Sequence, residues 1–113
     1  AASILSNQVI AVLDMGYTLL EDCSFTRDEA LRATGQLVMR NIENVLEAGC
    51  DGALTGPIER NDIETVKKHI ACMQNDDSDD VRLYKMLGTK LVNIAEKKNP
   101  DKDYTQMMEL LRG

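Results

Sequence analysis

The strongest constraint on the fold is a long run of apolar residues near the start of the chain. Residues 3–20 carry a single charged side chain, Asp14. We predict a helix over residues 4–22 that is apolar on nearly every side, and such a helix needs cover on all sides. We therefore expect it to be buried, with part of its cover supplied by another chain or domain. Asn7, Gln8 and Asp14, together with Gly16, make the run too polar for a membrane span.

A second helix is predicted from a capping box, in which Thr26 is the N-cap and Glu29 reaches back to it. It extends to about residue 48, and Gly49 ends it in the usual C-terminal position. Helical spacing predicts that its inward stripe consists of Ala30, Thr34, Leu37, Val38, Ile42, Val45 and Leu46.

Three further helices are predicted in the second half, after an irregular centre over residues 49–60. Asn61 or Asp62 caps the third helix, and a polar turn over residues 75–80 leads to the fourth, which starts at Ser78 or a neighbouring aspartate. Pro100 stops the fourth helix, because the residue before proline avoids helical angles. Asp101 or Asp103 opens the last helix. The inward stripes are Ile63, Val66, Ile70 and Met73, then Val81, Tyr84, Leu87, Leu91, Ile94 and Ala95, and finally Tyr104, Met107, Met108 and Leu111.

These patterns predict an all-α fold, a compact bundle of about five helices in a single domain over residues 1–113. Sustained period-two alternation is lacking, and aromatic residues make up only 4% of the chain, which disfavours a sheet. The net charge of −6 argues against binding to nucleic acid or to an anionic membrane. Three widely spaced cysteines and the lack of a secretory leader favour the reducing cytoplasm.

No metal site or catalytic residue is predicted. The acidic cluster at residues 76–80 fails the EF-hand pattern, because Val81 and Leu87 occupy the positions that need glycine and glutamate. His69 and Cys72 are three residues apart on a helix, but they lack further ligands at suitable spacing, so we interpret His69 as a partly buried structural residue. A nucleophile pair of Cys50 and His69 stays open, without a motif that supports it.

The segment LTGPIERND, residues 54–62, has more glycine, proline and hydrogen-bonding side chains than a simple connection needs. Gly56 would let backbone amides approach a ligand, and Arg60 could pair with an anionic group. The alternative is a rigid connection in which Arg60 pairs with Asp62 or Glu64. From the residues alone, the structural interpretation is favoured about two to one, since most loops only connect.

Two stretches together resemble a known family. The first is AASILSNQVIAVL, residues 1–13, with an alanine pair, a Ser-Asn pair and an apolar run. The second is NIENVL, residues 41–46, followed by the T-G-P-x-x-R-x-D pattern within residues 54–62. Both are similar to the C-terminal helical domain, catalogued as DUF2520, of oxidoreductase-like proteins with a Rossmann domain. That family is related to deazaflavin-dependent NADP reductases and, more distantly, to the helical domain of 6-phosphogluconate dehydrogenase-like enzymes. Residues 96–113 lie outside the resemblance.

The resemblance implies a helical domain that follows an N-terminal Rossmann domain, dimerises and closes over a cleft for nicotinamide and substrate. We expect the homodimer to form through the first helix, which is apolar on nearly every side. The positions that match the family's motifs, and that become candidates for the cleft, are Ser6, Asn7, Thr55, Gly56, Pro57, Arg60 and Asp62. The cofactor would be NADP or NAD in the full-length protein. None is expected for the 113-residue chain, because the G-x-G-x-x-G fingerprint is missing.

Two functions from different classes follow. The first is the dimerisation and substrate-cleft domain of an NAD(P)-dependent oxidoreductase, not catalytic on its own; the start at Ala1 without methionine suggests a C-terminal fragment of a longer chain. The second is a helical module that binds a separate protein through its first helix. The residues leave the substrate, the choice between NAD and NADP, and the reaction open.

Overall fold

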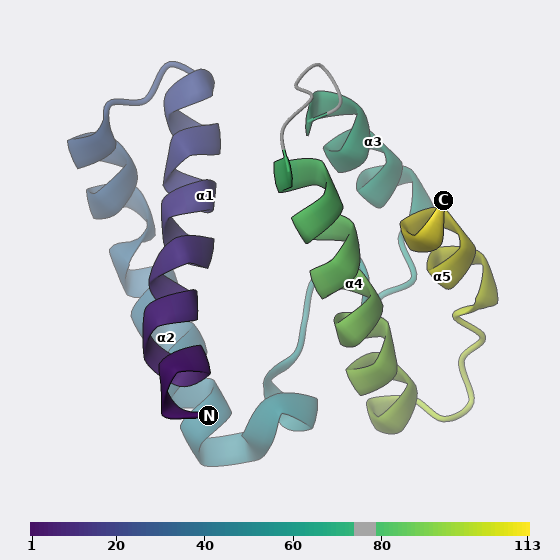
Figure 1. Cartoon of the computed structure of the whole chain (residues 1–113). Coiled ribbons are helices and arrows are strands. Elements are labelled where there is room, and N and C mark those ends of the chain that lie inside the picture. The colour runs from purple at the N-terminus through teal and green to yellow at the C-terminus, as the bar shows by residue number, and fades with distance from the viewer. Residues whose placement is uncertain (74–78) are drawn as a thin grey trace. The chain divides into compact units, whose positions relative to one another are not determined.

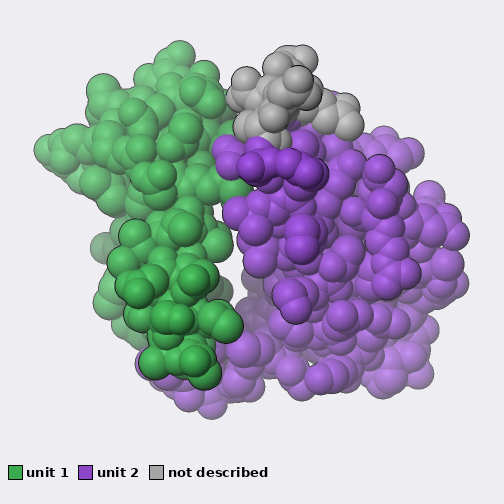
Figure 2. Space-filling model, in the orientation of Figure 1, with its two compact units in different colours: residues 1–43 green, residues 44–113 purple. Residues whose placement is uncertain are grey.

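The computed structural model describes residues 1–73 and 79–113, and all of its regular structure in these ranges is helical. The elements are a π-helical stretch η1 (Ile4–Gln8) and the α-helices α1 (Val9–Asp22), α2 (Arg27–Ala53), α3 (Ile63–Met73), α4 (Asp79–Lys98) and α5 (Thr105–Arg112) (Figure 1). They form two compact units, Ala1–Glu43 and Asn44–Gly113, called unit 1 and unit 2 below (Figure 2). The predicted all-α class with five helices is confirmed.

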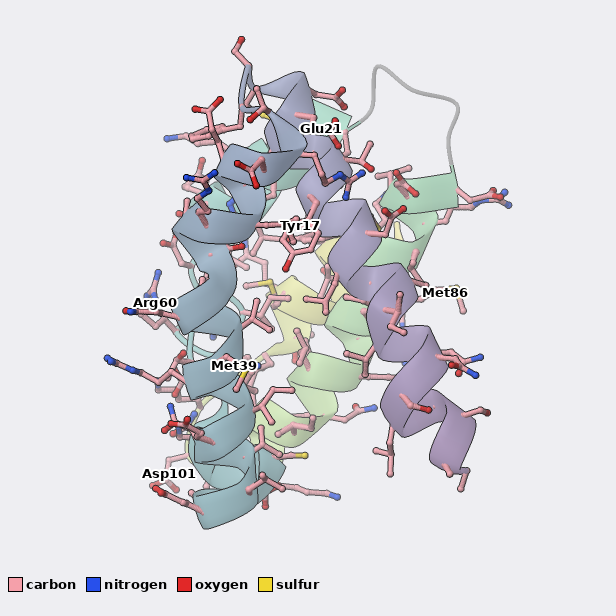
Figure 3. The ribbon with its side chains drawn as sticks, turned by 90° about the vertical axis from the view of Figure 1, so that its left-hand side faces the viewer. Tyr17, Glu21, Met39, Arg60, Met86 and Asp101 are labelled. Carbon is pink, nitrogen blue, oxygen red and sulfur yellow. The ribbon has the colours of Figure 1, made fainter. Side chains whose placement is uncertain are left out.

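Unit 1 is a helical hairpin of η1, α1 and most of α2, and its turn is fixed by polar contacts. The predicted capping box forms: the Glu29 amide donates to Thr26 Oγ1 at 3.1 Å, and the Thr26 amide donates to Glu29 Oε1 at 3.3 Å. Arg27 joins the two helices, since its guanidinium lies 3.2 Å from Asp14 Oδ1 and 2.7 Å from Glu21 Oε1. It also lies over the ring of Tyr17, which Figure 3 labels beside Glu21 on α1.

The expectation that the first helix is buried is wrong for the chain taken alone. No residue of η1 or α1 is buried, and Leu5 is 80% exposed. The predicted inward stripe of α2 is confirmed only in part. Ala30 is buried and Thr34, Val38 and Val45 are half-buried, whereas Leu37, Ile42 and Leu46 are exposed. A hairpin of two helices has too few elements to enclose an apolar helix, so its cover has to come from elsewhere.

The second helix runs five residues further than predicted, but Gly49 interrupts it where the sequence indicates an end. Gly49 has φ 75° and ψ 173°, angles that lie outside the helical region and that glycine adopts without a steric penalty. The residues after it, up to Ala53, return to helical hydrogen bonding. The glycine signal was therefore placed correctly, and the short helical continuation was missed.

Unit 2 contains a true core, formed where α3, α4 and α5 meet. Among the described residues the core side chains are Ile58, Val66, Ile70, Val92, Ala95, Tyr104, Met107 and Leu111. The stripe predicted for α3 is confirmed, with Val66, Ile70 and Met73 buried. The stripe predicted for α4 is confirmed in part, since Ala95 is buried and Val81, Tyr84 and Leu91 pack partly buried against the core. The other buried positions, Gly88 and Val92, were not in the predicted stripe.

Gly88 lets α5 approach α4 closely, as its place in a helix interior predicts. A Cβ built on Gly88 would lie 2.8 Å from Leu111 Cδ2 and 3.4 Å from Ile58 Cδ1. Both neighbours belong to the core, and Leu111 is 2% exposed. Glycine therefore lowers the helix propensity of α4 at this position but allows close packing of the core.

Most of the polar turn predicted over residues 75–80 lies outside the described residues. The same holds for Asp76, Asp77 and Ser78 of the acidic cluster, and so for the alternative in which the fourth helix starts at Ser78. In the described part, α4 begins at Asp79 and ends at Lys98, just before Asn99 and Pro100, as predicted. No helix in this part is long and apolar enough to cross a membrane.

Candidate functional site

Residues 54–62, called the motif turn below, form one compact bend between α2 and α3. Gly56 has φ 99°, and a Cβ built on it would meet open space, so the positive φ rather than crowding requires glycine there. Pro57 follows and starts a helical turn in which the Arg60 amide donates to Gly56 O at 3.0 Å. Five of the predicted site residues therefore lie on this one bend of unit 2: Thr55, Gly56, Pro57, Arg60 and Asp62.

Asp62 caps α3, which settles the choice between Asn61 and Asp62. Its Oδ2 accepts from the Thr65 hydroxyl at 2.7 Å, and its Oδ1 accepts from the Thr65 amide at 3.1 Å. These two hydrogen bonds, with a smaller contribution from the charge of Arg60, hold the pKa of Asp62 below its ordinary value. Asn61 instead adopts φ 62° and donates from Nδ2 to Asp103 O at 2.7 Å.

Arg60 is the one cationic side chain of the motif turn, and it lies at the surface of unit 2 (Figure 3). Its side chain is 58% exposed, and its guanidinium is 3.9 Å from Asp62 Oδ2, at the limit of an ion pair. The predicted pairing of Arg60 with Asp62 therefore exists but is weak, because solvent screens it. Most of the hydrogen-bonding capacity of the guanidinium stays available for an anionic group.

The motif turn is tied to the connection between α4 and α5, which the sequence analysis did not associate with the site. The Tyr104 hydroxyl donates to Glu59 O at 2.6 Å, and Asn99 Nδ2 donates to Glu59 Oε1 at 3.0 Å. Lys98 Nζ donates to Leu54 O at 2.7 Å. These contacts span 40–45 residues of sequence, so helical periodicity held no signal for them. They add Lys98, Asn99 and Tyr104 to the residues that shape the site.

Ser6 and Asn7 lie on η1 in unit 1, whereas the motif turn belongs to unit 2. Both are exposed, and the Ser6 hydroxyl donates to Ala2 O at 2.9 Å, one helical turn earlier. A serine that bonds to its own helix in this way is common in helices and indicates no particular chemistry. Their proposed place in a cleft stays a prediction.

His69 is exposed rather than partly buried, which corrects the interpretation made from the sequence. Its Nδ1 lies 3.2 Å from the hydroxyl of Tyr84 on α4, and the two rings meet edge to face. Burial raises the pKa of Tyr84, so that hydroxyl keeps its proton at neutral pH. Cys23, Cys50 and Cys72 are exposed free thiols. Within residues 1–73 and 79–113, no three His, Cys, Asp or Glu side chains are grouped closely enough to hold a metal ion.

An open cavity of about 620 Å³ lies on unit 2 along α5 and the end of α4. Its lining includes the apolar side chains of Val92 and Met108, the ring of Tyr104, and charged side chains such as Glu96, Lys102 and Arg112. None of the predicted site residues lines this cavity. Tyr104 links the two regions, because it lines the cavity and its hydroxyl donates to Glu59 O in the motif turn.

The comparisons with known proteins identify the family. Residues 1–91 match the model of DUF2520, a domain of unknown function. Searches of the curated proteins and of the solved structures give no match. The matched segment includes the apolar first helix and the whole motif turn, and it covers well over half of the sequence. The chain therefore belongs to the DUF2520 family.

Proposed function

We propose that this chain is the dimerising helical domain of an NAD(P)-dependent oxidoreductase, and that it works beside a Rossmann domain that binds the dinucleotide. The observation that carries the proposal is the exposed apolar surface of unit 1. Membership of the DUF2520 family and the resemblance of that family to NADP reductases support the oxidoreductase part of it. The helical domain would supply a dimer interface and one wall of the cleft.

Unit 1 exposes large apolar side chains on both of its helices. On η1 and α1, Ile4 and Ile10 are each 64% exposed and Leu5 is 80% exposed. On α2, Leu37 is 69% and Met39 61% exposed. Large apolar side chains exposed in this number are typical of an interaction site in soluble proteins.

A second copy of the chain is the occupant that we favour. Residues 3–20 carry only Asp14, so two copies of this face meet without the repulsion expected for a chain of net charge −6. Five large apolar side chains of this face are exposed, namely Ile4, Leu5, Val9, Ile10 and Val12. Their burial from each copy, at about 1–2 kcal/mol per side chain, contributes roughly 10–20 kcal/mol. Association costs roughly 4–15 kcal/mol in lost freedom of motion, so the face is large enough for a dimer.

Sedimentation of the chain over a wide range of micromolar concentrations tests the dimer. We expect a dimer for the unmodified chain and weaker association for Leu5→Glu and Ile10→Glu, because each charge would have to be desolvated in the interface. Gln36→Glu is the matched control, since it adds the same charge at an exposed polar position on α2. A monomer at every concentration would contradict the proposal and favour a module that binds a separate protein.

The cleft role of the motif turn has its own test at Arg60, in the protein that contains this domain together with its Rossmann domain. A charge-assisted hydrogen bond contributes about 1.5–3 kcal/mol, so Arg60→Ala is expected to weaken NADPH binding roughly 10- to 100-fold. Arg82→Ala is the control, because it removes the same charge from an exposed position on α4. Unchanged affinity for NADPH in Arg60→Ala would contradict a ligand-binding role.

A further inference from the structure

We propose that Lys98, Asn99 and Tyr104 are positioning residues for the motif turn, and that they fix the backbone from which Arg60 reaches its ligand. This inference rests on the proposed function, in which the motif turn is part of the cleft. The three residues lie beyond residue 91, where the match to the DUF2520 model ends. The family model therefore assigns them no role.

The three side chains hold the motif turn at two separated points of its backbone. Lys98 binds the carbonyl of Leu54, at the start of the turn, through a hydrogen bond of 2.7 Å. Tyr104 binds the carbonyl of Glu59, directly before Arg60, through a hydrogen bond of 2.6 Å. The backbone between these points, with Gly56 at positive φ, is restrained from both ends.

Asn99 completes the arrangement by joining the other partners. Its Nδ2 donates to Glu59 Oε1 at 3.0 Å and to the hydroxyl of Tyr104 at 3.1 Å. The Tyr104 hydroxyl thus accepts one hydrogen bond and donates another, which uses its full capacity as a donor. Tyr104 is 3% exposed and packs in the core, so its hydroxyl is a fixed reference point rather than a mobile surface group.

The direction of Arg60 follows from these restraints. Glu59 precedes it and is held through both its carbonyl and its carboxylate. The Ile58 side chain is 6% exposed and packs in the core, which prevents the turn from rotating about its anchors. Arg60 is left on the outer side, with its guanidinium exposed. A preorganised cation binds an anion without the cost of ordering the loop.

Amide hydrogen exchange of the 113-residue chain, followed by NMR, tests the positioning. The reporters are the amides of Arg60, Asn61 and Asp62, which donate to Gly56 O, Ile58 O and Pro57 O. Tyr104→Phe keeps the ring and removes the hydroxyl, and with it about 1 kcal/mol of hydrogen bonding. We therefore expect exchange at the reporter amides to speed up about tenfold more than exchange at the core amides of α4. Lys98→Met is expected to act in the same direction at Leu54 and its neighbours, and Lys98→Arg to restore protection, since it keeps a donor.

Asp103→Ala is the matched control. Asp103 Oδ1 accepts from the amide and hydroxyl of Thr105, whereas only its backbone carbonyl contacts the motif turn. The control should speed exchange at the start of α5 and leave the reporters in the turn unchanged. An equal rise at all amides of unit 2 in Tyr104→Phe would overturn the inference, because the hydroxyl would then only stabilise the fold.

Affinity for NADPH, in the protein with both domains, separates this inference from the proposed function. We expect Tyr104→Phe to weaken binding about three- to tenfold, and to add no further loss once Arg60→Ala is present, because it acts through Arg60. If Arg60→Ala weakens binding and Tyr104→Phe does not, the positioning role is overturned. If Tyr104→Phe speeds amide exchange in the motif turn but neither Tyr104→Phe nor Arg60→Ala changes NADPH affinity, the proposed cleft function fails. The positioning of the motif turn by Tyr104 would still stand.

Discussion

The close packing of α5 against Gly88 predicts that Gly88→Ala destabilises the chain, although alanine is the better helix former. In an open helix the replacement would stabilise by about 1 kcal/mol. At Gly88 the new methyl carbon would lie 2.8 Å from Leu111 Cδ2 and 3.1 Å from Leu111 Cδ1. Carbon atoms pack at about 3.5–4.0 Å, so the side chain of Leu111 has to move.

The sign of the effect depends on whether Leu111 can move without cost. It is 2% exposed and surrounded by core residues such as Met107, which is fully buried. Overpacking of a filled core costs about 1–3 kcal/mol. After the gain in helix propensity, we expect a net loss of up to about 2 kcal/mol in the free energy of unfolding.

Urea unfolding followed by circular dichroism provides the measurement. Gly35→Ala is the control, because a Cβ built on Gly35 meets nothing within 4 Å, and it should stabilise. In the background of Leu111→Ala, which removes both clashing methyl groups, Gly88→Ala should become stabilising as well. A stabilising Gly88→Ala in the unmodified chain, with no change of sign when Leu111 is truncated, would refute the packing argument.

Three further predictions concern polar contacts. Arg27→Met should lower the stability of the hairpin by about 1 kcal/mol or less, because the ion pairs of Arg27 are partly exposed. The loss should shrink in 1 M NaCl, since salt screens such pairs. An equal loss at low salt and in 1 M NaCl would contradict an ionic role. Thr26→Ala should cost about 1 kcal/mol in urea unfolding, whereas Thr26→Ser should cost much less, because serine keeps the capping hydroxyl. The pKa values of Asp62 and Asp103 in the folded chain lie below their ordinary value of 3.8. The free energy of unfolding that these carboxylates contribute is therefore fully present above pH 3.8 and is lost as the pH falls through the folded pKa. Thermal unfolding between pH 5 and pH 2.5 should show this fall, and a shallower one in Asp62→Asn with Asp103→Asn; identical slopes would contradict the assignment.

Local signals in the sequence predicted the local structure well. The capping box at Thr26, the interruption at Gly49 and the end of α4 before Pro100 all appear where they were expected. Each of these depends on residues within about four positions of one another, which a sequence displays directly. The class of the fold follows from the same kind of signal.

Burial and long-range contacts were harder to predict, for a physical reason. The apolar circumference of residues 4–22 predicted a buried helix, yet η1 and α1 contain no buried residue in the chain taken alone. That another chain or domain covers them stays a prediction. His69 stands beside an apolar stripe in sequence and yet is exposed, with its Nδ1 3.2 Å from the hydroxyl of Tyr84 on α4. The contacts of Tyr104 and Lys98 with the motif turn depend on tertiary packing, which helical periodicity in the sequence does not predict.

The position of the core relative to the family boundary has a practical consequence. Of the ten buried hydrophobic residues in the described ranges, five lie after residue 91: Val92, Ala95, Tyr104, Met107 and Leu111. The segment that matches the family model thus contains only part of the core of unit 2. A chain trimmed to residues 1–91 would lose half of these buried side chains and cut α4 within its length. A chain expressed for folding studies should therefore include residues 92–113.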